Sequence, residues 1–253
     1  MPYSGPLPYS YDEEHEYIHT WAVPSATLAA AQHLHVAISA KHNSYQLNRF
    51  SPAPGEYVVR VDCAQSDWHA MGRARGSAVP HLAELPNPHQ PYKSTDLDKA
   101  QKLHLQALSL LEMEVISKFE ANNVGYRRCV FRTDEVQVLD MGEMRADPMR
   151  WCAGTKARHK DPPCSPVAGE PVVCCFTVSG NGRVVFDYKG VHYPPIQTTK
   201  GTAYMFYDTA YTVLHHRVEE DLSMRGETRK AVILRGQVVQ ELVRTARGDP
   251  GPS

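Results

Sequence analysis

Residues 172–188 read VVCCFTVSGNGRVVFDY, two short apolar runs on either side of a glycine-rich turn. The runs, 172–178 and 184–188, consist largely of β-branched and aromatic residues, which favour strands. The linker Ser179-Gly180-Asn181-Gly182 has the residues that favour tight turns. The stretch therefore predicts two strands joined by a turn.

The same pattern extends to both sides of these two strands, over residues 126–240. Turns that contain glycine or polar residues separate further short strands, which are predicted at 128–132, 136–139, 204–207, 212–218 and 230–239. Short strands at this spacing are typical of an antiparallel sandwich or jelly roll.

Residues 1–125 have a different pattern. An apolar run that follows Ser25, a good N-cap residue, predicts a helix to about Ala40. In residues 95–122 apolar side chains recur at spacings of three and four, which predicts a longer helix. Residues 51–93 are rich in proline and predict loops around one strand near 57–61.

These patterns together predict an α+β protein with a β-rich core. We expect a single domain over residues 1–253. Its expected parts are a mostly helical and loop-forming support region over 1–125, a jelly-roll catalytic core over 126–240 and a disordered tail over 245–253.

The composition argues against several classes of protein. The chain has 27 Lys and Arg residues against 28 Asp and Glu, so it lacks the positive charge that nucleic-acid binding requires. No apolar run is long enough to span a membrane, and the acidic N-terminus does not resemble a signal peptide. We therefore expect a cytoplasmic protein that binds neither nucleic acid nor membranes. The six cysteines form no CxxC pair and are expected to be reduced. Nothing in the sequence indicates an oligomeric state.

With thirteen histidines, the chain is expected to contain metal-binding motifs by chance. His15-Glu16-Tyr17-Ile18-His19 spells the HExxH motif of zinc proteases. Few residues precede this motif, several of them proline, glycine or tyrosine, and the next glutamate after it is Glu56. We interpret it as a coincidence.

A second candidate motif is His159-Lys160-Asp161, an HxD sequence. In isolation it is equally expected by chance. It gains weight from the order of the later segments, which are the two strands of 172–188, then His215-His216-Arg217-Val218, and then Arg229 at the start of the last predicted strand.

This succession resembles the Fe(II)/2-oxoglutarate-dependent oxygenases, whose double-stranded β-helix is a cupin-like jelly roll. Members of that family carry HxD near the first core strands, a histidine late in the core and an arginine on the next strand. The resemblance covers residues 126–240 and implies that His159, Asp161 and His216 are the Fe(II) ligands. His215 is the alternative third ligand, because neighbouring strand residues point to opposite faces and only one can point inward. His216 is preferred since Arg-Val follows it directly, as in the family pattern.

The resemblance also implies that Arg229 pairs with the far carboxylate of 2-oxoglutarate. A guanidinium group binds a carboxylate through two charge-assisted hydrogen bonds. Arg225 is the alternative anchor, at a spacing from His216 closer to that of the family, but Gly-Glu-Thr follows it and predicts a turn. A purely structural role for Arg229 is also open, in which it pairs with Glu219 or Glu220 across a hairpin.

The resemblance thus implies a non-haem iron oxygenase that uses Fe(II), 2-oxoglutarate and O₂ and releases succinate and CO₂. Its substrate is expected to be a small molecule, such as an amino acid or a secondary-metabolite intermediate, which is most commonly hydroxylated. Two other interpretations are open: a cupin-like metal enzyme that does not use 2-oxoglutarate, and a non-catalytic β-sandwich binding module. The sequence does not identify the substrate or distinguish hydroxylation from desaturation or cyclisation.

Overall fold

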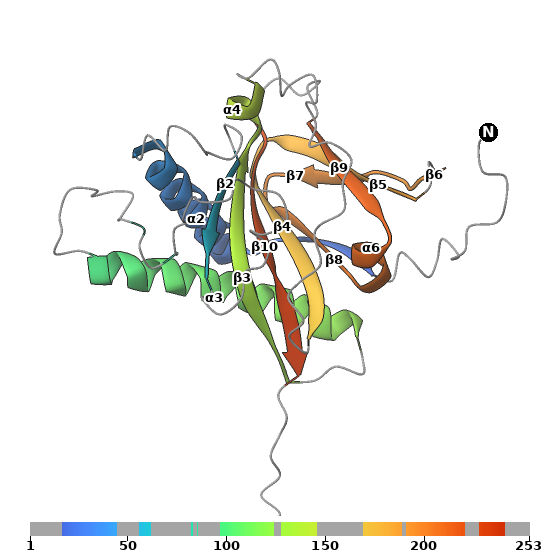
Figure 1. Cartoon of the computed structure of the whole chain (residues 1–253), viewed down its shortest axis with the longest axis horizontal. Coiled ribbons are helices and arrows are strands. Elements are labelled where there is room, and N and C mark those ends of the chain that lie inside the picture. Colours follow the sequence, from blue (N-terminus) through green and yellow to red (C-terminus); the bar gives the residue numbers. More distant parts are fainter. Residues whose placement is uncertain are drawn as a thin grey trace, which may run out of the picture.

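A computed structural model of the chain describes residues 17–44, 56–61, 82, 85, 97–123, 128–145, 169–188, 191–220 and 228–240. These residues form two antiparallel β-sheets, with two long helices against the larger sheet (Figure 1). None of the helices in these ranges is long and apolar enough to cross a membrane.

The larger sheet has the strand order β1-β8-β4-β10-β3-β2. Its strands are β1 (Ile18–Ala22), β2 (Glu56–Arg60), β3 (Cys129–Asp140), β4 (Glu170–Ser179), β8 (Thr202–Tyr207) and β10 (Lys230–Gln240). The smaller sheet contains β5 (Asn181–Tyr188), β6 (Val191–His192), β7 (Ile196–Thr199) and β9 (His215–Glu220). In this sheet β5 is central, since β6 and β7 pair along one of its edges and β9 pairs along the other.

The chain alternates between the two sheets. Strands β3 and β4 lie in the larger sheet, β5 and β7 in the smaller, β8 in the larger, β9 in the smaller and β10 in the larger. Antiparallel strands that alternate in this way form a double-stranded β-helix, or jelly roll. The predicted α+β jelly roll is therefore confirmed, on the strand order of the described residues.

Helices α2 (Ser25–Ser44) and α3 (Leu97–Asn122) cover the outer face of the larger sheet (Figure 1). Their buried side chains, Leu34 and Phe119 among them, join one face of the sheet in a first hydrophobic core. A second core fills the space between the two sheets. In β4, Cys174 belongs to the first core and Cys175 to the second. The apolar run of β4 is therefore continuous because both of its faces are covered.

The sequence predictions for the helices and for most of the strands are confirmed. The helix predicted after Ser25 is α2, the helix predicted over 95–122 is α3, and the two strands predicted over 172–188 are β4 and β5, which lie in different sheets. The two strands predicted over 128–139 are one continuous strand, β3. The tail expected over 245–253 lies outside the described residues.

The strand predicted over 212–218 is wrong in its first part. The short helix α6 (Asp208–Thr212) occupies residues up to Thr212, and β9 begins only at His215. Asp208 has a left-handed backbone (φ 50°), and the Thr212 hydroxyl donates to its carbonyl oxygen at 3.0 Å. Thr212 therefore ends a turn of helix, and Val213 and Leu214 connect it to β9.

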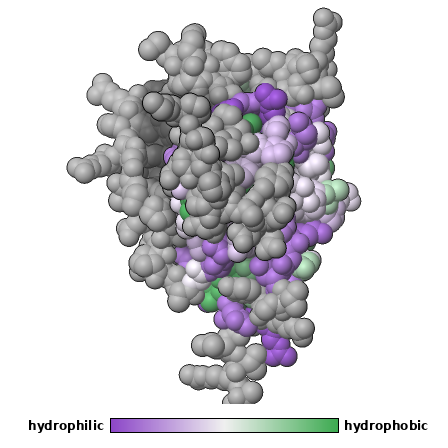
Figure 2. All heavy atoms as spheres, turned by 90° about the vertical axis from the view of Figure 1, so that its right-hand side faces the viewer, coloured by the Kyte–Doolittle hydropathy of each residue, from purple (hydrophilic) through white to green (hydrophobic). Residues whose placement is uncertain are grey.

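The surface on the side of the smaller sheet is mainly hydrophilic where the structure describes it. Figure 2 views the molecule from the right-hand side of Figure 1 and shows only small hydrophobic areas among the coloured residues. Exposed large apolar side chains occur instead on α2 and α3; they include Val36, Leu103, Leu105, Leu110 and Met113.

Candidate functional site

His216 on β9 points into the space between the two sheets. Its side chain is buried, and its ring centroid lies 5.6 Å from that of Phe186 and 5.0 Å from that of Phe206. Both phenylalanines belong to the core between the sheets. Because β5 and β8 contribute one ring each, the imidazole is held between the smaller and the larger sheet.

His215, the alternative to His216, points to the opposite face of β9. The register pairs His216 with Phe186 and pairs His215 with Asp187, the next residue of β5. Successive residues of a strand alternate between faces. Of the two adjacent histidines, His216 is thus the one that faces the interior of the jelly roll.

Arg229, directly before β10, is completely buried. Its Nε donates to the Thr198 hydroxyl oxygen at 3.2 Å, and its Nη2 donates to the Cys175 sulfur at 3.7 Å. Thr198 belongs to the smaller sheet and Cys175 to the larger, so the side chain bridges the two sheets from inside. Desolvation of a guanidinium group is costly, so a fully buried arginine needs specific interactions that stabilise its charge and satisfy its donors.

The carboxylate proposed from sequence as a structural partner of Arg229 is engaged elsewhere. Glu219 accepts a hydrogen bond from the Nε of Arg217 at 2.7 Å, and its other oxygen accepts one from Arg183. Burial alone would raise the pKa of Glu219, but the two arginines outweigh this effect and lower the pKa. The side chain of Glu220 lies outside the described residues.

Glycines of the β4–β5 turn make room for Arg229. A Cβ atom on Gly182 would lie 2.6 Å from the Arg229 Cδ, and one on Gly180 would lie 2.5 Å from the Arg229 amide nitrogen. Gly180 also has a left-handed backbone, with φ 66°. The glycines that predict the turn from sequence thus also permit the close approach of Arg229.

His216 and the Arg229 guanidinium lie in neighbouring rows of the core. The register of the larger sheet defines a Val173 row and a Cys175 row across its inner face. The Val173 row comprises Phe206, Val173, Arg235 and Glu135, and the Cys175 row comprises Tyr204, Cys175, Ile233 and Gln137. His216 packs on Phe206 of the first row, and Arg229 Nη2 contacts Cys175 of the second. Rows two residues apart are separated by about 7 Å.

Arg235 forms a buried polar cluster on the same inner face. Its Nη1 donates to Glu135 Oε1 at 3.0 Å and also to the side-chain oxygen of Gln137. All three side chains are buried. No sequence motif singles out this cluster, whose only signal is an arginine inside an otherwise apolar predicted strand.

The remaining residues predicted for the site lie outside the described residues. They are His159 and Asp161, the HxD pair, and Arg225, the alternative anchor. Among the residues that the structure describes, no group of three or more His, Cys, Asp or Glu side chains is placed to hold a metal ion. The structure therefore places His216 and Arg229 in the same space between the sheets, and the metal-ligand role of His159, Asp161 and His216 stays a prediction.

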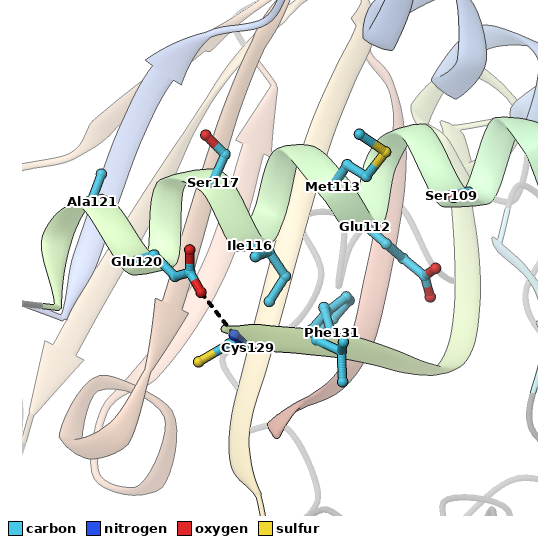
Figure 3. A pocket seen from close by; sticks show the side chains of 10 residues that line it. Ser109, Glu112, Met113, Ile116, Ser117, Glu120, Ala121, Cys129 and Phe131 are labelled. Carbon is cyan, nitrogen blue, oxygen red and sulfur yellow. Dashed lines mark hydrogen bonds between the residues drawn. The ribbon is translucent and has the colours of Figure 1, made fainter. Parts of the chain in front are cut away.

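A separate groove lies on the helix side of the larger sheet, between α3 and the first half of β3 (Figure 3). Its volume is about 820 Å³. Glu120 of α3 accepts a hydrogen bond from the Cys129 amide at 2.7 Å, and Glu112 accepts from the Thr133 amide at 3.3 Å and its hydroxyl at 2.7 Å. Burial raises the pKa of Glu112, although the bonds from Thr133 oppose this. These carboxylates accept hydrogen bonds from the backbone of β3, and they lie on the face of the sheet opposite to His216.

No family model matches the chain, and no curated protein matches it. Solved structures similar to it include that of OsALKBH1, with a TM-score of 0.47 and 12% identity over 86% of this chain and 97% of the other. A prolyl-4-hydroxylase of Pseudomonas putida is similar with a TM-score of 0.35 and 12% identity, over 91% of this chain and 97% of the other. Both likenesses are distant, and the jelly-roll architecture rests on the strand order.

Proposed function

We propose that this protein is an Fe(II)- and 2-oxoglutarate-dependent oxygenase. In this proposal His159, Asp161 and His216 hold the iron, and Arg229 binds the far carboxylate of 2-oxoglutarate. One observation carries the proposal: His216 and Arg229 enter the same space between the sheets, in neighbouring rows of its core. Their order along the chain, after the HxD pair, is the order that the family resemblance requires.

The donor set fits the implied metal. Two imidazoles and one carboxylate on one side of an iron leave coordination positions for a co-substrate and O₂. When bound, the iron would supply the activation of O₂ that C–H oxidation needs. His216 suits the role of ligand because Phe186 and Phe206 hold its ring between the sheets.

Arg229 fits the implied co-substrate. The gap of about 7 Å between the two rows matches the length of a short dicarboxylate that reaches from the level of His216 to the guanidinium. The surrounding wall is apolar and aromatic; it includes Phe186, Tyr204, Phe206 and Tyr211. Such a wall excludes water and strengthens the attraction between the guanidinium and a carboxylate.

We propose a small-molecule substrate, on the basis of the balanced charge of the chain. A cytoplasmic location and the absence of nucleic-acid and membrane partners are likewise predictions from the sequence.

The first test is the binding of Fe(II) and 2-oxoglutarate by the purified protein without oxygen. We expect one bound iron and a visible metal-to-ligand absorption band, and in air the formation of succinate from 2-oxoglutarate. His216→Ala should weaken metal binding by more than about 100-fold. His215→Ala, the matched control from the opposite face, should bind metal as the wild type does. Wild-type protein that shows neither the band nor succinate would contradict the proposal.

A second variant separates this function from a cupin-like metal enzyme that does not use 2-oxoglutarate. Arg229→Leu should still bind metal but should lose the band that 2-oxoglutarate produces, because the anchor for its far carboxylate is gone. If Arg229→Leu retained the affinity of the wild type for 2-oxoglutarate, Arg229 would not be the anchor.

A further inference from the structure

Thr198 on β7 is buried beside Arg229, where the far carboxylate of the proposed co-substrate would bind. Its side chain is 1% exposed, and its hydroxyl oxygen accepts the hydrogen bond from Arg229 Nε. Thr198 lies directly opposite Gly182, the glycine that gives the Arg229 side chain its space. Two neighbouring positions of the smaller sheet therefore contact one arginine: Thr198 accepts a hydrogen bond from it, and Gly182 leaves room for its side chain.

A guanidinium group can hold a carboxylate in two ways. It can use Nε together with one Nη, or it can use both Nη atoms at its end. At Arg229 the Nε–H is directed to Thr198, so a carboxylate bound through both Nη atoms would leave this hydrogen bond intact. The contact of Nη2 with the Cys175 sulfur further limits rotation of the group.

We propose that Thr198 is a positioning residue: it orients Arg229 so that the two Nη atoms, and not Nε, bind the far carboxylate of the co-substrate. This inference rests on the proposed function. It goes beyond that function because it assigns a task to a residue of β7 that no motif in the sequence indicates.

The test measures the affinity of the full-length protein for 2-oxoglutarate by calorimetry, with Mn(II) in place of iron so that no turnover occurs. Thr198→Val keeps the shape of the side chain but removes the acceptor. We expect its affinity for 2-oxoglutarate to fall about 10- to 100-fold, the usual effect of a lost hydrogen bond to a charged group. Thr198→Ser keeps the hydroxyl and should restore binding to within about threefold of the wild type.

Two controls separate positioning from general damage. Thr199→Val alters the next residue of β7, which is exposed on the opposite face, and should bind 2-oxoglutarate as the wild type does. Pyruvate has the keto acid but lacks the far carboxylate, so Thr198→Val should not change its affinity. If Thr198→Val does not fold, Thr198→Ala removes the same acceptor in a smaller side chain.

The outcomes distinguish this inference from the proposed function. If the wild type does not bind 2-oxoglutarate, the proposed function fails. If the wild type binds it and the variants without the hydroxyl bind equally well, the role of Thr198 is wrong. Equal losses for 2-oxoglutarate and pyruvate, or a failure of Thr198→Ser to restore binding, would also overturn it, since both indicate a structural defect.

Discussion

Two buried arginines flank the first half of β10, and they are held differently. Arg235 donates to the carboxylate of Glu135 and to Gln137. Arg229 donates to the hydroxyl of Thr198 and to the sulfur of Cys175. Arg235 is thus paired with a carboxylate inside the fold, and the contacts of Arg229 with Thr198 and Cys175 join the two sheets.

The ion pair of Arg235 and Glu135 gives a prediction at the scale of single residues. Glu135→Leu should lower the free energy of unfolding by about 3 kcal/mol, because it leaves a buried charge without its carboxylate. The double variant Glu135→Leu/Arg235→Met should regain most of that loss, because it removes both charges. Urea unfolding at neutral pH measures both values. An equal loss in the two variants would show that packing, and not charge, is the cause.

At the scale of elements, the sequence predicted the helices and strands whose signals lie in neighbouring residues. Helix α2 follows an N-cap residue, α3 has apolar residues at spacings of three and four, and the segment between β4 and β5 has turn residues. Strand β1 was not predicted, because it has only five residues and its partner β8 lies far along the chain. The order of the motifs indicated His216 and Arg229 as candidates.

Thr198 and Gly182 could not be linked to Arg229 from the sequence. Their roles depend on the register between β5 and β7 and on the position of Arg229 between the sheets. Neither feature is encoded in a short motif. A buried site assembled from several strands is therefore harder to predict than the strands themselves.

The contact between α2 and β3 gives a prediction for pH. His35 on α2 is buried, and its Nε2 lies 3.1 Å from the Leu139 carbonyl oxygen. Burial lowers the pKa of His35 below its ordinary value of 6.5, and the bond to Leu139 only partly offsets this. The unfolded chain thus takes up the proton first, so the stability that neutral His35 contributes is present above pH 6.5 and is lost as the pH falls below it.

His35→Gln isolates this effect, since glutamine keeps a donor for the Leu139 carbonyl but has no charge to gain. Between mildly alkaline and mildly acidic pH, the urea midpoint of the wild type should fall further than that of His35→Gln. All other histidines are common to the two proteins. Parallel pH profiles would mean that His35 does not contribute to acid destabilisation.

At the scale of the whole molecule, the N-terminal part of the chain does more than support the jelly roll. The two outermost strands of the larger sheet, β1 and β2, both come from it. Between them α2 crosses the outer face of the same sheet (Figure 1). The jelly-roll strands and the N-terminal segments therefore share one hydrophobic core and should unfold together.

Trp21 tests this coupling. Its ring packs edge-to-face on Phe176 of β4, with centroids 6.5 Å apart. Trp21→Ala should lower the free energy of unfolding of the whole protein by about 2 to 3 kcal/mol in a single transition. Trp21→Phe should stay close to the wild type, because Trp21 Nε1 is buried without a hydrogen-bond partner among the described residues. Thr20→Ala, at an exposed site on the same strand, is the control. Two separate transitions in the Trp21→Ala variant would show that the N-terminal segments unfold independently.

The groove between α3 and β3 has a consequence for the protein in concentrated solution. Strand β2 pairs with residues 135–139 of β3, and no other described strand covers the first half of β3 on this side. A bare strand edge is a template on which another molecule can add its own strand, the first step towards aggregates. Glu120 and Glu112 occupy the amides of Cys129 and Thr133 there. Because side chains of a helix already bind these two amides, fewer donors are left there for a strand of another molecule to pair with.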